Sequence, residues 1–284
     1  MDDFVNAIGN YRRNVLMTTR VPDGTPARRI PILAWSFPAA VKSFAARKTA
    51  PIRAGIAFLL GALFAQVGGL ETAMAQPGYV QGNSATPQTA QTTVTVPYTA
   101  AQTAGNLNLV IVGWNDPSAL VSSVTDSKGN TYSLAVGPTV LSAANGGPLG
   151  QSIYYAKNIA AATAGANVVT VKFTAAASFP DIRVLEYSGL NPATPLDVAV
   201  GASGNSATSS SGSVTTTNAT DLLVGANTVA TSTNGPGTGF TLRLNTPDGD
   251  IAEDRVVTAT GSYSASAPLS SPGGWVMQIV TLHP

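Results

Sequence analysis

The sequence predicts an all-β protein, a two-sheet antiparallel β-sandwich, and three observations lead to this prediction. After residue 92, short runs of alternating apolar and polar residues are separated by turn residues, at intervals near the roughly 8–12 residues of sandwich folds. No segment after residue 76 shows sustained helical periodicity. Charged residues make up only 10% of the chain, where about 25% is usual, so the surface is expected to be neutral and rich in hydroxyl groups.

The expected strands begin near residue 93. The run 93–96 alternates Thr and Val, which is the period of a half-buried strand. The run 107–114, LNLVIVGW, is apolar almost throughout and is typical of a central strand. The remaining strands are expected at 120–125, 131–136, 152–158, 166–174, 181–188, 196–200, 222–229, 240–244, 251–258, 261–264 and 275–282. A short helical turn fits only at 156–164.

A hairpin is expected where the strands 120–125 and 131–136 flank the sequence DSKGN. Asp126 can accept hydrogen bonds from its own turn, and Gly129 can adopt a positive φ. Numerous strands that each bury one face pack most economically as two sheets face to face. A jelly roll and an elaborated immunoglobulin-like Greek key both satisfy this pattern.

Four segments are expected along the chain. Residues 1–46 form an extension with little stable structure, and residues 47–75 form a helical signal segment. Residues 76–91 are polar and poor in large apolar side chains, as in a linker, and residues 92–284 form the sandwich domain. Two smaller sandwiches joined through the Ser/Gly/Thr-rich tract 201–213 are the alternative to a single domain.

The segment 47–75 contains the three parts of a secretory signal in the right order. A basic start is followed by an apolar stretch over 54–64 and by the small-residue sequence A-M-A at 73–75. This pattern predicts export from a bacterial cell and cleavage between Ala75 and Gln76. An uncleaved anchor is the alternative, although the apolar run is shorter than the roughly 20 residues of a stable span.

Charge and residue usage exclude several classes of function. Past residue 75 the chain has six basic and ten acidic residues, a formal charge of −4, so it lacks the basic stripe that nucleic-acid binding requires. It has no cysteine and one histidine, His283. Disulfides, thiolate chemistry, a Ser-His-Asp triad and a multi-histidine metal site are therefore excluded within one chain. Membrane contact is expected only through the export segment.

Four aromatic residues are candidates for binding a glycan, because a ring face can stack on the apolar face of a sugar. They are Trp114, Tyr132, Tyr154 and Tyr155. Trp114 ends a strong strand and could lie near a loop rim, although core packing is the preferred interpretation. Tyr154 and Tyr155 are consecutive, so in a strand one ring faces each side of the sheet.

The densest acidic cluster lies in the sequence PDGDIAED. Asp248, Asp250, Glu253 and Asp254 could supply the oxygen ligands that calcium prefers. Their spacing does not match an EF-hand loop, and solvated turn acids are the alternative. No other cofactor is expected. Glu253 and Asp254 are also the residues on which acid catalysis would depend, although adjacent strand residues point to opposite faces.

Several longer motifs carry a resemblance. These are GNLNLVIVGWND, VTDSKGNTYSLA, QSIYYAKNI, DIRVLEYSGL and the ending WVMQIV, which together cover about residues 90–282. With these motifs the chain resembles a group of secreted bacterial β-sandwich proteins. The motifs are strands and turns rather than catalytic signatures, so the resemblance implies fold and export and no reaction.

The expected function is a secreted, non-catalytic module for binding or adhesion at a cell surface, with a glycan as the candidate ligand. A structural subunit of an extracellular fibre or surface layer, self-associating by strand addition, is the first alternative, because the low charge leaves sheet edges unprotected. A glycan-active enzyme that uses acidic residues alone is the second alternative.

Overall fold

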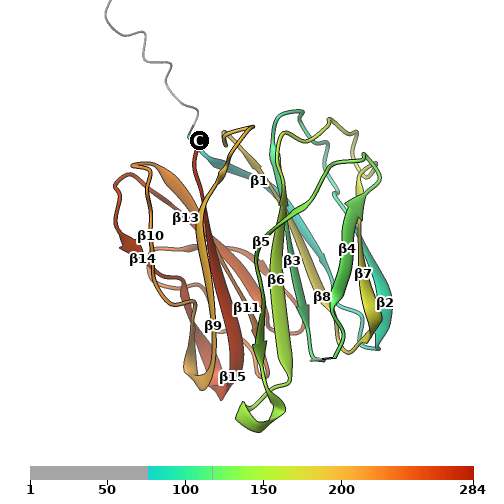
Figure 1. Cartoon of the computed structure of the whole chain (residues 1–284), viewed down its shortest axis with the longest axis vertical. Helices are drawn as coiled ribbons and strands as arrows, with labels where there is room; N and C mark the ends of the chain where they lie inside the picture. The colour runs from blue at the N-terminus through green and yellow to red at the C-terminus, as the bar shows by residue number, and fades with distance from the viewer. Residues whose placement is uncertain (1–75, 117) are drawn as a thin grey trace, which may run out of the picture. The chain divides into compact units, whose positions relative to one another are not determined.

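The computed structural model describes residues 76–116 and 118–284. The extension 1–46 and the export segment 47–75, with the expected cleavage site after Ala75, lie outside these residues. Within them the architecture is almost entirely β and every strand pairing is antiparallel, which confirms the predicted class (Figure 1). None of the described segments forms a helix with the length and hydropathy that crossing a bilayer requires.

The strands divide into two consecutive halves of the chain. The first half contains β1 (Gly78–Ala85), β2 (Gln91–Pro97), β3 (Leu107–Trp114), β4 (Val121–Asp126), β5 (Ser133–Leu141), β6 (Leu149–Ala156), β7 (Val168–Ala177) and β8 (Asp181–Ser188). The second half contains β9 (Leu196–Ser210), β10 (Val214–Thr215), β11 (Asp221–Val229), β12 (Thr241–Asn245), β13 (Ile251–Val257), β14 (Ser262–Tyr263) and β15 (Ser266–Leu282). One 3-10 helix, η1 (Ala143–Asn145), lies between β5 and β6.

These strands form two five-stranded inner sheets and two smaller outer sheets. The first inner sheet has the order β1-β8-β3-β6-β5, and the second inner sheet has the order β12-β13-β11-β15-β9. The three-stranded sheet β2-β7-β4 covers the first inner sheet, and the pair β10-β14 covers the second. The layers follow one another across Figure 1, from β10 and β14 at the left to β2 and β7 at the right.

The layering is consistent with a β-sandwich but is deeper than the two sheets expected from the sequence. The reason lies in strands that are buried on both faces, because every residue of β3 and of β11 is buried. Val110 and Val112 of β3 pack toward the first outer sheet, whereas Leu109 and Ile111 pack toward the second inner sheet. A strand that is apolar on both faces requires a covering layer on each side.

The two halves share one strand connectivity. In each inner sheet the first strand of the half pairs with the last, and the last pairs with the third. Two consecutive strands complete the sheet, β6 and β5 in the first half and β13 and β12 in the second. In each outer sheet the second strand pairs with the next to last, β2 with β7 and β10 with β14. An isolated bridge between Thr233 and Leu269 stands where β4 pairs with β7 in the first half.

A buried polar network lies between the inner sheets, beside their shared apolar cluster. Arg183 has no exposed surface, and its Nε pairs with Asp181 Oδ1 at 2.9 Å. Its Nη1 donates to the main-chain carbonyls of Asn227 and Ile251, and its Nη2 donates to Gln151 Oε1 at 3.3 Å. Because these acceptors belong to both inner sheets, Arg183 fixes how the two halves dock.

Two segments without a clear strand pattern form edge strands. The expected linker 76–91 contains β1, which pairs with β8 from Gly78 to Ala85. The tract 201–213, for which a loop or a weak edge strand was expected, lies largely within β9, which pairs with β15 along most of its length. Both strands occupy sheet edges and consist of small polar residues, so they lack the apolar alternation that marks a strand in sequence. The segment 156–164 contains no helical turn.

Candidate functional site

Trp114 belongs to the core rather than to a rim. Its side chain is 1% exposed and packs between the first inner sheet and its cover, with its ring edge-on to Phe173 at 5.9 Å between centroids. Its indole Nε1 has no hydrogen-bond partner among the described residues. The preferred interpretation of core packing is confirmed and the alternative rim position is not observed, because β3 is buried on both faces up to its last residue.

The three tyrosines expected at a binding surface are partly buried and pack against two different clusters. Tyr132 and Tyr154 pack against the cluster under the first outer sheet, and Tyr155 packs against the cluster between the inner sheets. The hydroxyl of Tyr132 donates to Asp126 Oδ2 at 3.0 Å and accepts from Asn108 Nδ2 at 3.3 Å. These rings therefore do not form a common platform.

The four acids of the expected calcium cluster separate into three environments. Glu253 Oε2 accepts from the Gly237 main-chain N–H at 2.6 Å, and Asp254 pairs with Arg243 at 2.8 Å. Asp248 and Asp250 lie together in the turn between β12 and β13. The described residues contain no group of three or more His, Asp or Glu side chains suited to a metal ion. The calcium cluster is therefore not assembled as the sequence suggested.

A small hollow brings two of these acids next to an exposed aromatic ring. We call it the rim pocket; it encloses about 180 Å³ and is lined by Asn115, Phe179, Val229, Ala230, Thr231, Asp248 and Asp250. Four segments supply these residues: the ends of β3 and β11, the turn between β7 and β8, and the turn between β12 and β13. Both halves of the chain therefore contribute to one pocket.

Phe179 is presented by a strained turn. Its side chain is 48% exposed, and its backbone has a φ of 44°, a left-handed conformation that is rare for a bulky residue. The Asn115 main-chain N–H donates to the Ser178 carbonyl at 2.8 Å and ties this turn to the end of β3. Such strain costs about 1–3 kcal/mol and is typically retained where a site needs it.

The two acids of the rim pocket differ in burial and in their partners. Asp250 is 3% exposed, and its Oδ1 accepts from the Val229 main-chain N–H at 2.8 Å. Burial and the nearby Asp181 carboxylate raise the pKa of Asp250 well above its ordinary value, although Arg183 acts in the opposite direction. Asp248 is half-buried, and its Oδ1 accepts from Gln88 Nε2 at 2.7 Å. The pocket thus pairs a buried acid with a partly exposed acid.

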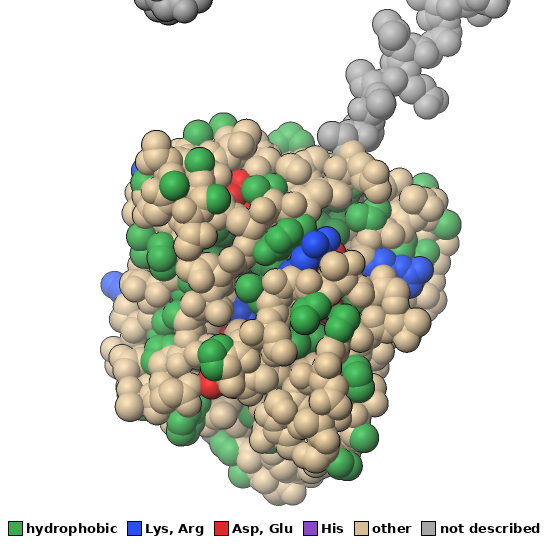
Figure 2. Space-filling view, turned by 180° about the vertical axis from the view of Figure 1, so that it is seen from behind, with side chains coloured by type: hydrophobic (Ala, Val, Ile, Leu, Met, Phe, Trp, Pro, Cys, Tyr) green, Lys and Arg blue, Asp and Glu red, His purple; other side chains and the backbone are tan. Residues whose placement is uncertain are grey.

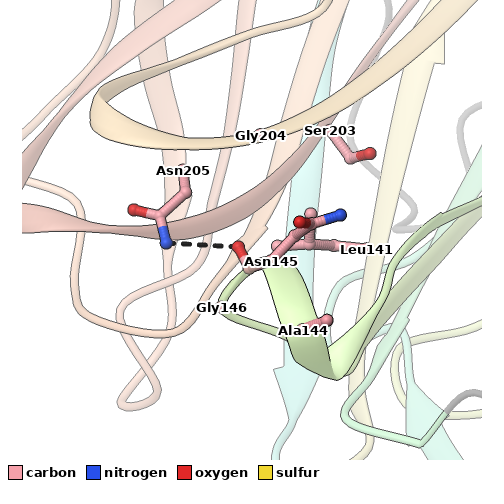
Figure 3. Close-up of a pocket in the computed structure, with 7 residues that line it drawn as sticks. All are labelled: Leu141, Ala144, Asn145, Gly146, Ser203, Gly204 and Asn205. Carbon is pink, nitrogen blue, oxygen red and sulfur yellow. Dashed lines mark hydrogen bonds between the residues drawn. The ribbon is translucent and has the colours of Figure 1, made fainter.

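A larger hollow lies between η1 and β9 and is drawn in Figure 3. It encloses about 430 Å³ and is lined by Leu141, Ala144, Asn145, Gly146, Ser203, Gly204 and Asn205. Asn205 Nδ2 donates to the main-chain carbonyl of Asn145 at 3.1 Å and joins the two walls. No aromatic or charged side chain lines this hollow, so it offers amide and hydroxyl groups without a ring or a charge to select a ligand.

A third hollow contains one of the predicted tyrosines. It encloses about 290 Å³ and is lined by Gly129, Asn130, Thr131, Ser133, Tyr155, Lys157 and Asn158. Lys157 Nζ donates to the Ala193 carbonyl. The Asn130 side chain donates to Asp126 and accepts from the Ala160 N–H. The strongest polar groups of this hollow are therefore already hydrogen-bonded within the chain. The rim pocket is therefore the better candidate site.

The surface around these hollows is poor in charge. Figure 2 shows one face on which backbone and uncharged polar side chains predominate and charged side chains are few. Comparisons with protein-family models, curated proteins and solved structures find no match for this chain.

The sequence analysis did not identify Phe179 and Asn115 as site residues. For Phe179 the available signal was the sequence S-F-P-D, in which a bulky residue precedes proline between two strands.

Proposed function

We propose that the exported part of this chain is a non-catalytic extracellular module that binds a saccharide in the rim pocket. The observation that carries this proposal is the Phe179 ring, held nearly half exposed by a strained turn at the edge of a hollow. Ligand pockets typically combine apolar surface with a few placed polar groups. The Asn115 amide, the Thr231 hydroxyl and the Asp248 carboxylate supply such groups around the ring.

The strand order supports the same class of protein. We infer that each half is built as a jelly roll, because its first and last strands pair at one edge of the inner sheet and its second and next-to-last strands pair in the outer sheet. Lectin domains are among the proteins that use this architecture. This likeness is one of architecture alone, and the chemistry of the pocket carries the functional proposal.

A non-catalytic role fits the positions of the acids better than acid catalysis does. Glu253 packs against Gly237 on the outer side of β13, whereas Asp254 pairs with Arg243. These two carboxyls point away from each other, so they do not flank one bond as the paired acids of glycosidases do.

The test is binding of saccharides to the purified protein, first on a glycan array and then by calorimetric titration. Phe179→Ala is expected to weaken binding of an array hit at least about tenfold, which corresponds to about 1.4 kcal/mol. Val140→Ala is the matched control, because Val140 is a similarly exposed apolar residue, 51% exposed, that lies outside the pocket. Failure to bind any saccharide, or equal binding by Phe179→Ala, would refute the proposal.

The structural-subunit alternative is favoured by one observation. The edge strand β5, SLAVGPTVL, carries no charge and exposes Leu134 and Val140. Uncharged edges invite pairing with a second copy. If this alternative holds, the protein should form polymers whose size increases with concentration in sedimentation experiments. The Leu134→Lys variant should then remain monomeric at the same concentrations. A monomer at every concentration would exclude it.

A further inference from the structure

We propose that the rim pocket selects saccharides that carry a free, protonated amino group over their N-acetylated counterparts. This inference rests on the proposed function and names the ligand class of the same site. Three features of the pocket lead to this inference. They are the signs of the charges in its lining, the unused hydrogen-bond acceptor positions of the Asp248 carboxylate and the position of the Phe179 ring.

The charge of the pocket is negative. Asp248 and Asp250 are the only ionisable residues among those that line it. The basic residue that acts on Asp250 is Arg183, which has no exposed surface and whose guanidinium is occupied by Asp181, Gln151 and two main-chain carbonyls. No lining side chain would therefore repel a cationic ligand.

Asp248 has unused hydrogen-bonding capacity. Among the described residues, its side chain accepts a hydrogen bond only from Gln88 Nε2, at 2.7 Å. A carboxylate has about four acceptor positions on its two oxygens, so one oxygen of Asp248 is available to a ligand. A charged donor such as an ammonium group forms the shorter and stronger class of hydrogen bond with a carboxylate.

The Phe179 ring adds a second attraction for the same group. An ammonium within about 6 Å of an aromatic face is attracted by the ring quadrupole, and an uncharged amide is not. The ring and the Asp248 carboxylate line one pocket of about 180 Å³, so one amino group of a small ligand can lie near both. N-acetylation removes the positive charge and adds bulk, and both changes disfavour this position.

The experiment compares glucosamine oligomers with N-acetylglucosamine oligomers of equal length, titrated into the purified full chain at about pH 6, where amines are protonated. The wild-type protein is expected to bind the amino form at least about fivefold more tightly, and less so at high salt. Asp248→Asn, which keeps the shape of the side chain, is expected to abolish this preference, so that the two sugars bind with equal affinity.

Asp197→Asn is the charge-matched control and should leave the preference intact, because Asp197 lies near the opposite end of β11, where it accepts hydrogen bonds from Thr217. Equal affinity for the two sugars, or a preference that survives Asp248→Asn, would overturn the inference while the proposed function stands. Absence of binding to both sugars and to every other saccharide would instead overturn the proposed function.

Discussion

The two halves of the molecule share a strand connectivity but hold their buried acids in different ways. In the first half, Glu186 is fully buried and accepts hydrogen bonds from the side-chain amides of Gln81, Gln102 and Asn106, at 2.7, 3.3 and 2.6 Å. Asp126, in the turn between β4 and β5, likewise accepts from main-chain and side-chain donors. These acids have the donors that an ionised carboxylate needs when it is buried.

In the second half, two buried acids lack such donors on one or both oxygens. Neither oxygen of Asp221 has a hydrogen-bond partner among the described residues, and Glu253 Oε1 also has none. Burial, followed by repulsion from Asp197, raises the pKa of Asp221 to about 7. Burial also raises the pKa of Glu253 to about 7, although the Gly237 N–H acts against it. The same topology therefore contains acids that hold a structure together and acids that bind protons.

The largest expected effect comes from uncoupling the two halves. Arg183→Met leaves Asp181 and Asp250 buried without their cation, and breaking a buried pair in this way costs about 3–5 kcal/mol of the free energy of unfolding. Urea unfolding followed by tryptophan fluorescence measures it. Arg255→Met is the control, because the exposed Arg255 should change stability by less than about 0.5 kcal/mol. Equal effects of the two variants would show that Arg183 does not couple the sheets.

Glu186→Gln tests the three side-chain amides that donate to Glu186 in the first half. The new NH₂ group faces the donors of Gln81, Gln102 and Asn106, so at least one buried donor loses its acceptor. We expect a loss of about 2–3 kcal/mol in the free energy of unfolding, measured by urea unfolding. A neutral effect would mean that Glu186 is not held as a carboxylate.

The second half should make the whole protein less stable as pH rises. Asp221 and Glu253 have pKa values raised above those of the unfolded chain, so the folded state binds more protons between about pH 4 and pH 7. Their stabilising contribution is complete below pH 4 and is lost as pH rises through about 7. We expect a loss of about 2 kcal/mol between pH 5 and pH 8, measured by urea unfolding at each pH. An increase in stability over this range would contradict the assignment.

The smallest expected effect sharpens the contrast between the halves. Glu253→Gln imitates the protonated acid, so it should be neutral at pH 5 and should stabilise the protein by about 1 kcal/mol at pH 8. The same change of Glu to Gln then has opposite signs in the two halves, with Glu186→Gln as the matched comparison. Thermal unfolding at the two pH values is sufficient. If Glu253→Gln destabilises at both, Glu253 is held as a carboxylate like Glu186.

The sequence allowed the strand class, the central strands and the turn at 126–130 to be predicted, because these features depend on local patterns. The run LNLVIVGW forms β3, and Asp126 caps its own turn by accepting from the main-chain N–H groups of Lys128 and Asn130, both at 3.0 Å. The expected hairpin is wrong, because β4 pairs with β7 in the outer sheet and β5 pairs with β6 in the inner sheet, so this turn connects two layers. The edge strand β1 and the later part of β9 have no apolar alternation, since their small polar residues become strands only through pairing with β8 and β15.

The site was less predictable than the fold. Whether Trp114 or Phe179 is exposed depends on a covering sheet whose strands, β2, β4 and β7, are assembled from distant parts of the chain. The separation of Asp248 and Asp250 from Glu253 and Asp254 likewise follows from where each residue falls on the turn or on either face of β13. Sequence spacing alone does not supply this information.

The pairing of first with last strands has a consequence for how the chain acquires its structure. The Ser188 hydroxyl of β8 donates to the Gly78 carbonyl of β1, 110 residues away in the sequence. In the second half, β9 likewise pairs with the final strand, β15. Long loops must close before such contacts contribute, so folding is expected to be slow, and neither half can complete its inner sheet until its final strand has been made. A chain that emerges N-terminus first would therefore keep both inner sheets incomplete until the last strand of each half has been made.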